Sequence, residues 1–158
     1  SSDINPVRSV PLMGPTLELD MAHNGRVSDF NAQIIDEFRA NSGFVQTAGF
    51  GRNLILLHTV GAKSGQKRYV PLMRVEENGH YAMVASKGGA PEHPAWYGNI
   101  TANPEVEVHD GIRHIDGVAR EISGAEREEW WERAVAAFPP YAEYQTKTDR
   151  QIPVFVLE

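Results

Sequence analysis

Short stretches of alternating apolar residues, joined by tight-turn dipeptides, constrain the fold of this chain more than any other feature. Asn78-Gly79 and Asp110-Gly111 each separate two such stretches, and both dipeptides favour the tight turns of β-hairpins. Helical patterns do not alternate regularly with the strands, so a parallel βαβ sheet does not fit. The expected class is α+β, mainly β: an antiparallel barrel of about six strands flanked by helices.

The chain of 158 residues is expected to hold one domain over residues 27–158, preceded by an irregular or mobile arm over residues 1–26 that carries three prolines. A helix is predicted from about Ser28, capped by Ser28 or Asp29, because Phe30, Ile34 and Phe38 share one face. A capping box at Ser123 and Glu126 predicts another helix. Shorter helices are expected from near Pro94 and over 141–148, and strands over 54–57, 67–75, 80–86, 105–109, 113–122 and 153–157.

Charge is distributed unevenly along the chain. The formal net charge is −6, which disfavours a nucleic-acid partner, yet residues 41–75 contain no Asp or Glu. That acid-free segment includes Lys63, Lys67 and Arg68, and a cluster of this kind can attract an anionic ligand. The alternative is a solvated surface loop in which the cations cluster by chance.

Two classes of chemistry find no support in the residue content. The chain has no cysteine, which excludes thiolate metal sites and thiol nucleophiles and fits a cytoplasmic location. Its six histidines follow no recognised metal-binding spacing, so each is expected to have a role other than metal ligation, and no metal site is predicted.

Three constellations could carry chemistry. Gly61 to Arg68 joins two strands and offers glycines, the Ser64 hydroxyl and three cations, which suit a phosphate; a plain basic hairpin is the alternative. Ala85-Ser86-Lys87 ends a strand ahead of Trp96 and could surround a planar heterocycle, although Trp96 could equally be a core residue. Tyr141 and Tyr144 would share a helix face and could line a pocket or simply pack.

Four blocks of the chain, in this order, resemble the deazaflavin (F420)-dependent nitroreductase family. The first runs from His58 to Leu72 and is similar to T-x-G-R-K-[ST]-G-x-x-R-x-x-P-L, and the second is Val84 to Ala90. The others are Pro94 to Pro104 and the tail from Tyr141 to Val154. The similarity covers about residues 44–157, which is most of the chain.

This resemblance implies a split β-barrel of the flavin-reductase-like superfamily and coenzyme F420 as hydride donor. It implies reduction of a small acceptor such as a quinone, a nitro compound or a conjugated enone, in an enzyme of actinobacterial type. The candidate cofactor-binding residues are Lys63, Ser64, Lys67, Arg68, Pro71, Ala85, Ser86, Lys87 and Trp96. The candidate catalytic residues, as proton donors to the reduced acceptor, are Tyr144, then Tyr141, then Ser86.

Two other functions remain open from the sequence. One is an FMN-dependent oxidase or reductase on the same barrel, since FMN also offers a phosphate and a planar ring. The other is a non-enzymatic F420 carrier, which would bind the cofactor without turnover. The arm could contact a membrane or a lipid substrate peripherally, and the sequence leaves the oligomeric state open.

Overall fold

The computed structural model describes residues 25–158, with side chains described from Asp29 onward, and the predicted arm lies almost wholly outside the described residues. The described strands form one seven-stranded sheet in the order β2-β1-β5-β6-β7-β4-β3, and all neighbouring pairs are antiparallel. The strands are β1 (Leu54–Val60), β2 (Lys67–Met73), β3 (Glu76–Glu77), β4 (His80–Val84), β5 (Glu105–Asp110), β6 (Arg113–Glu121) and β7 (Val154–Leu157).

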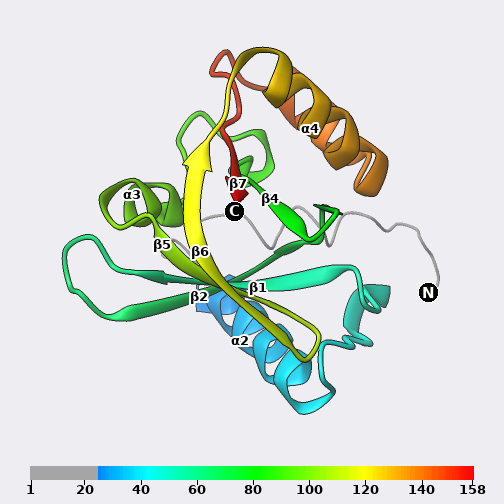
Figure 1. Ribbon diagram of the computed structural model, residues 1–158. Coiled ribbons are helices and arrows are strands. Elements are labelled where there is room, and N and C mark those ends of the chain that lie inside the picture. The colour runs from blue at the N-terminus through cyan, green and yellow to red at the C-terminus, as the bar shows by residue number, and fades with distance from the viewer. Residues whose placement is uncertain (1–24) are drawn as a thin grey trace.

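The sheet curls because its two edge strands follow one another in the chain. Only Arg74 and Val75 separate the end of β2 from the start of β3 at the opposite edge. The Arg74 amide still donates to the Asn53 carbonyl on the β1 side (2.8 Å), while the Val75 carbonyl accepts from Ala82 in β4 (2.9 Å). This corner draws the edges together into a curled half-barrel (Figure 1), which confirms the predicted antiparallel, split-barrel class.

Strands β1, β4 and β7 bury both of their faces. Along β1, Leu54 and Leu56 enter one apolar cluster, and Ile55 and Leu57 enter a second cluster on the other face. Successive side chains of a strand point to opposite faces, so a fully apolar run is what a covered strand requires.

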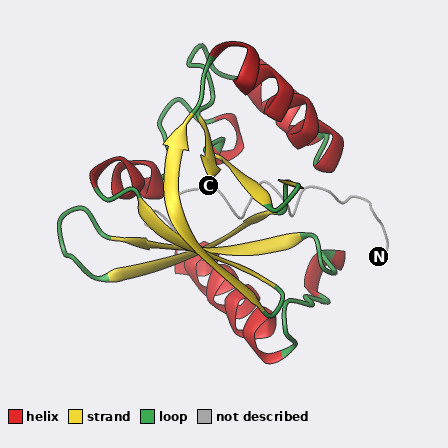
Figure 2. Ribbon diagram, viewed as in Figure 1, coloured by secondary structure: helices red, strands yellow, loops and turns green. Residues whose placement is uncertain are grey.

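Helices supply that cover (Figure 2). Along α2 (Gly25–Ala40), Ile34 and Phe38 are buried in the first cluster, which also receives side chains of α4 (Gly124–Ala137) and α5 (Pro140–Thr146). The short α3 (Ala95–Ala102) contributes Trp96 and Ile100 to the second cluster. Two single-turn 3-10 helices, η3 (Thr47–Gly49) and η4 (Lys87–Gly89), lie in the connections. None of the described helices is both long and apolar enough to span a membrane.

The structure corrects two local predictions. Helix α2 is already helical at Gly25, so Ser28 and Asp29 lie within it instead of capping it. Ser123 is the N-cap of α4 but makes no side-chain capping hydrogen bond. The Glu126 carboxylate instead accepts two hydrogen bonds from Arg120, at 2.7 and 3.0 Å, because a bidentate guanidinium offers stronger, charge-assisted contacts than a backbone amide.

Candidate functional site

The loop between β1 and β2, residues 61–66, folds tightly on itself. The Gly61 amide donates to the Gln66 carbonyl at 2.7 Å, and the Gly65 amide donates to the Gly61 carbonyl at 3.0 Å. A Cβ on Gly61 would stand 2.6 Å from the Ser64 hydroxyl, so the turn needs glycine at this position. The hydroxyl of Ser64 accepts the Gln66 amide at 3.1 Å and lies 3.4 Å from the Arg68 guanidinium.

Residues 61–68, here called the basic loop, comprise this connection and the start of β2, and no described carboxylate neutralises their three cations. Lys63, Lys67 and Arg68 are all exposed. Among the described residues, none of the three forms an ion pair with a carboxylate. The loop therefore presents fixed positive charge beside a hydroxyl, which is the donor set that an anionic phosphate requires.

A second loop, residues 86–90, follows β4 and is held by Arg150. The Arg150 guanidinium donates to three backbone carbonyls: Ala85 at 3.2 Å, Ser86 at 2.8 Å and Ala90 at 2.9 Å. Lys87, in the same loop, adopts the left-handed region at φ 47°. Its side chain is buried along most of its length and places Nζ 3.5 Å from the Glu92 carboxylate.

Helix α5 packs directly on this second loop. A Cβ on Gly89 would lie 2.7 Å from the Tyr144 carbonyl, so glycine permits the close approach. The rings of Tyr141 and Tyr144 meet edge to face at 6.1 Å, which confirms that the two residues share a helix face. Both side chains are buried, at 1% and 3% exposure, against Phe138. Their assignment as proton donors stays a prediction.

Helix α3 connects the two loops. At its C-terminal half, Asn99 accepts the Ala62 amide at 3.0 Å and so holds the basic loop. Just before the helix, His93 stacks on Tyr97 at 4.1 Å and places Nδ1 3.0 Å from Arg150. Burial first, and then the Arg150 charge, lower the pKa of His93, so its neutral Nδ1 can accept a hydrogen bond from Arg150.

The predicted ring-binding residues occupy both faces of the sheet. Ala85 and Trp96 are buried together in the second apolar cluster, with Ser86 fully buried at the strand end. Pro71 pairs with Leu56 across β1 and β2, and directly opposed residues share a face, so Pro71 faces the first cluster. Its place on edge strand β2 is as predicted for a proline that donates no ladder hydrogen bond. Pro71 and Trp96 therefore face different apolar clusters.

A cleft of about 450 Å³ lies over the end of β1, the start of β5 and the middle of β6, and Val60 and Lys67, which flank the first loop, line one part of it. Of the predicted site residues only Lys67 lines it, and Glu105, Glu107 and Asp116 give it a negative balance. His58 also reaches this cleft; burial first, then the neighbouring His109, lower its pKa to about 4. The cleft therefore favours a cation over an anionic cofactor.

Sequence reasoning missed Arg150 and His93, which fix the second loop. Arg150 stands in the fourth block of the family resemblance and His93 directly precedes the third, but nothing in their spacing indicates a joint role. The contact between Arg150 and Ser86 spans 64 residues and exists only in the folded chain.

The chain is similar to several known proteins. The model of the F420H(2)-dependent quinone reductase family matches residues 32–158. An F420H(2)-dependent quinone reductase of Mycobacterium tuberculosis is 38% identical over 106 residues, covering 65% of this chain and 71% of the relative. A second relative from M. tuberculosis, named as a putative enzyme of the same kind, is 33% identical, covering 70% of this chain and 94% of its own.

Two solved structures are also similar. A structure described as an F420-H2 dependent reductase (FDR-A) shares 68% identity with a TM-score of 0.65, covering 68% of this chain and 95% of its own. A chain described as a domain-swapped dimer shares 57% identity with a TM-score of 0.67, covering 83% of this chain and 98% of its own.

Proposed function

This chain belongs to the F420H(2)-dependent quinone reductase family, and we propose that it passes a hydride from reduced coenzyme F420 to a quinone. The observation that carries the proposal is the unneutralised basic loop, joined through α3 to a second loop that Arg150 holds in place. Nitro compounds and conjugated enones belong to the proposal as further acceptors, because a hydride donor reduces any sufficiently electrophilic acceptor that fits the site.

The basic loop would hold the anionic tail of the cofactor. Lys63, Lys67 and Arg68 supply charge that no described carboxylate neutralises, and Ser64 supplies a hydroxyl next to Arg68. The tail of F420 carries phosphate and glutamates, so this donor set fits it. A neutral or cationic ligand would gain nothing from three exposed cations.

The second loop would hold the ring. Ser86 and Lys87 stand where Arg150 fixes the backbone, while Ala85 and Trp96 form the apolar surface behind them. Pro71 faces the first apolar cluster, on the other side of the sheet. It would contact the ring only where the ring reaches the open edge of β2. Arg150 is a positioning residue in this scheme, since its hydrogen bonds go to the loop's carbonyls.

Reduced F420, when bound, supplies the hydride, so the protein has to position the acceptor and deliver a proton. Tyr144 is the first candidate for that proton, followed by Tyr141 and Ser86. Both phenols are buried against Phe138, so delivering the proton requires α5 to shift relative to α4. The α5–η4 contact at Gly89 would transmit that shift to the cofactor loop.

Titration of the purified protein with F420 and, separately, with FMN tests the choice of cofactor. We expect saturable F420 binding that quenches tryptophan fluorescence, with FMN bound at least about tenfold more weakly, since FMN has no glutamate tail for the basic loop. Equal or tighter FMN binding would favour the FMN-dependent alternative. Tight F420 binding without turnover of any quinone would favour a carrier.

A further inference from the structure

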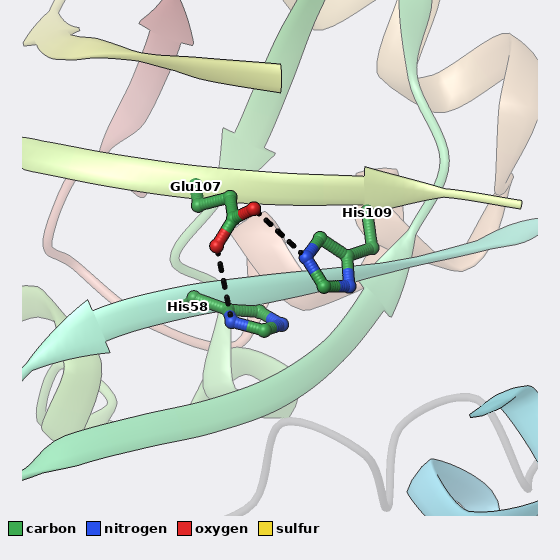
Figure 3. Close-up of side chains that lie close together, drawn as sticks. All are labelled: His58, Glu107 and His109. Carbon is green, nitrogen blue, oxygen red and sulfur yellow. Dashed lines mark ion pairs between the residues drawn. The ribbon is translucent and has the colours of Figure 1, made fainter. Parts of the chain in front are cut away.

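Two histidines and a glutamate outside the proposed cofactor site converge on one point of the sheet surface. His58 stands directly opposite Glu107 in the β1–β5 register, and His109 lies two residues beyond Glu107 on β5. Residues two apart in a strand share a face, so the register alone places all three side chains together (Figure 3). The face is the one that carries Leu54 and Leu56 further along β1.

From this convergence we propose that His58, Glu107 and His109 form a zinc site. The Nδ1 atom of His58 lies 3.6 Å from Oε1 of Glu107, and Nε2 of His109 lies 3.1 Å from Oε2. One ligand atom of each residue lies within 4.8 Å of the other two. Four ligands at about 2.0–2.1 Å from a tetrahedral zinc stand roughly 3.3–3.4 Å apart, so small side-chain adjustments are enough.

Contacts within the cluster leave part of its hydrogen-bonding capacity unused. The 3.6 Å separation between Nδ1 of His58 and Oε1 of Glu107 is too long for a hydrogen bond, whereas Nε2 of His109 contacts Oε2 of Glu107 at 3.1 Å. The other ring nitrogen of His58, Nε2, is buried and makes no hydrogen bond among the described residues. The imidazole of His58 is thus only partly satisfied by its neighbours, and a bound cation would complete the arrangement.

The surroundings favour the entry of a cation. The side chains of His58 and His109 are only 14% and 15% exposed, while Glu107 is 33% exposed and borders the acidic cleft together with Glu105 and Asp116. Lys67 on the cleft and Arg39, whose guanidinium lies 4.7 Å above the Tyr69 ring beside His58, oppose this balance. Three carboxylates still line the cleft that reaches His58.

Three protein ligands leave a fourth coordination position, as in zinc sites that bind water or a substrate oxygen. His114 lies beside two of the three ligands: its Nδ1 is 3.7 Å from Oε2 of Glu107, and its ring stacks on His109 at 3.5 Å. Because His114 is 57% exposed, it can turn toward the ion or away from it. The donor set of imidazole and carboxylate suits zinc better than magnesium or calcium.

Calorimetric titration of the full, tag-free, chelator-treated chain with Zn²⁺ tests the proposal without reference to F420. We expect one zinc per chain, and at least about tenfold weaker binding in both His109→Gln and Glu107→Gln. His80→Gln is the matched control, because His80 is an exposed histidine on β4 outside the cluster, and its affinity should equal that of the wild type.

Two further measurements keep the result decisive if a variant folds poorly. Circular dichroism checks the fold of each variant, and Co²⁺ bound to the wild type should show the strong visible bands of a four-coordinate ion. Absence of one-to-one Zn²⁺ binding in the wild type, only the weak bands of six-coordinate Co²⁺, or equal affinity in folded His109→Gln would overturn the site.

Discussion

The Arg150 guanidinium donates a 2.8 Å hydrogen bond to the carbonyl of Ser86, a residue 64 positions earlier in the chain. The same group reaches the carbonyls of Ala85 and Ala90, so one side chain fixes the whole turn after β4. A planar guanidinium holds its N–H donors at fixed angles and so fixes the positions of these three carbonyls. The ammonium of lysine has rotatable donors on a flexible stem and does not fix them in this way.

Arg150→Lys should therefore weaken F420 binding by about tenfold or more, since hydrogen bonds from a charged donor contribute roughly 1.5–3 kcal/mol each. Arg133→Lys is the control, because Arg133 lies on the surface of α4 near Glu77. Fluorescence titration measures both affinities. Wild-type affinity in Arg150→Lys would mean that the turn keeps its shape without the guanidinium.

The basic loop should dominate the electrostatic part of cofactor binding. Lys63→Ala and Arg68→Ala are each expected to weaken F420 binding about 10- to 100-fold. Wild-type affinity should also fall with added salt, and the fall should be smaller in the variants. Arg52→Ala is the matched control, since Arg52 lies in the same acid-free segment but binds the Ser42 carbonyl instead. If all three variants bind alike, the tail is held elsewhere.

Tyr144→Phe separates proton delivery from packing. The substitution keeps the buried ring that meets Tyr141 and removes only the hydroxyl. We expect near-normal F420 affinity and turnover at least about tenfold lower, the cautious end of the range for general acid catalysis. Tyr97→Phe, which loses a 3.3 Å contact with Glu121 outside the core, is the control.

Steady-state kinetics with a quinone and a nitro compound would decide between the roles of Tyr144. Full activity of Tyr144→Phe with both acceptors would assign the residue to packing alone. Activity lost with one acceptor would make it a specificity residue.

Tyr81 provides a pH-dependent test of the fold. Burial, and then its 2.5 Å hydrogen bond to Asp110, raise the pKa of Tyr81 to about 12. In the unfolded chain a tyrosine ionises near pH 10, so the folded state holds the proton more tightly between these values. The stabilisation is complete below about pH 10 and is lost as the pH rises through about 12.

Absorbance titration of the tyrosines should accordingly show a late component near pH 12 that Tyr81→Phe reduces. The difference in free energy of unfolding between the wild type and this variant should shrink over the same pH interval. A titration of the wild type that is complete by about pH 11 would contradict the buried network of Tyr81 and Asp110.

Local patterns allowed the strands and their faces to be predicted. Tyr81, Met83 and Ala85 were expected on one face of their strand and share the second apolar cluster, and Pro71 was expected at an edge and lies there. These features depend on neighbours within a strand or hairpin, where alternation and turn chemistry decide the outcome. The cap at Ser123 failed because Arg120 from another element competes for Glu126.

Features that depend on tertiary contacts were beyond local patterns. His58 and His109 lie far apart in sequence, and only the β1–β5 register brings both to Glu107. The burial of Tyr144 depends on how α5 packs against α4. The hydrogen bonds from Arg150 to the second loop form only because the segment before β7 passes beside that loop. Sequence spacing carries no information about either arrangement.

Anaerobic mixing of reduced F420 with a quinone, with and without the protein, tests the central claim most directly. Recovery of the oxidised deazaflavin absorbance reports hydride transfer, and chromatography reports the quinol. We predict protein-dependent oxidation of reduced F420, one quinol per cofactor, and a rate that falls in Arg68→Ala at subsaturating cofactor. Oxidation no faster than in the protein-free control, at saturating F420 and with any of several quinones, would contradict the proposed function.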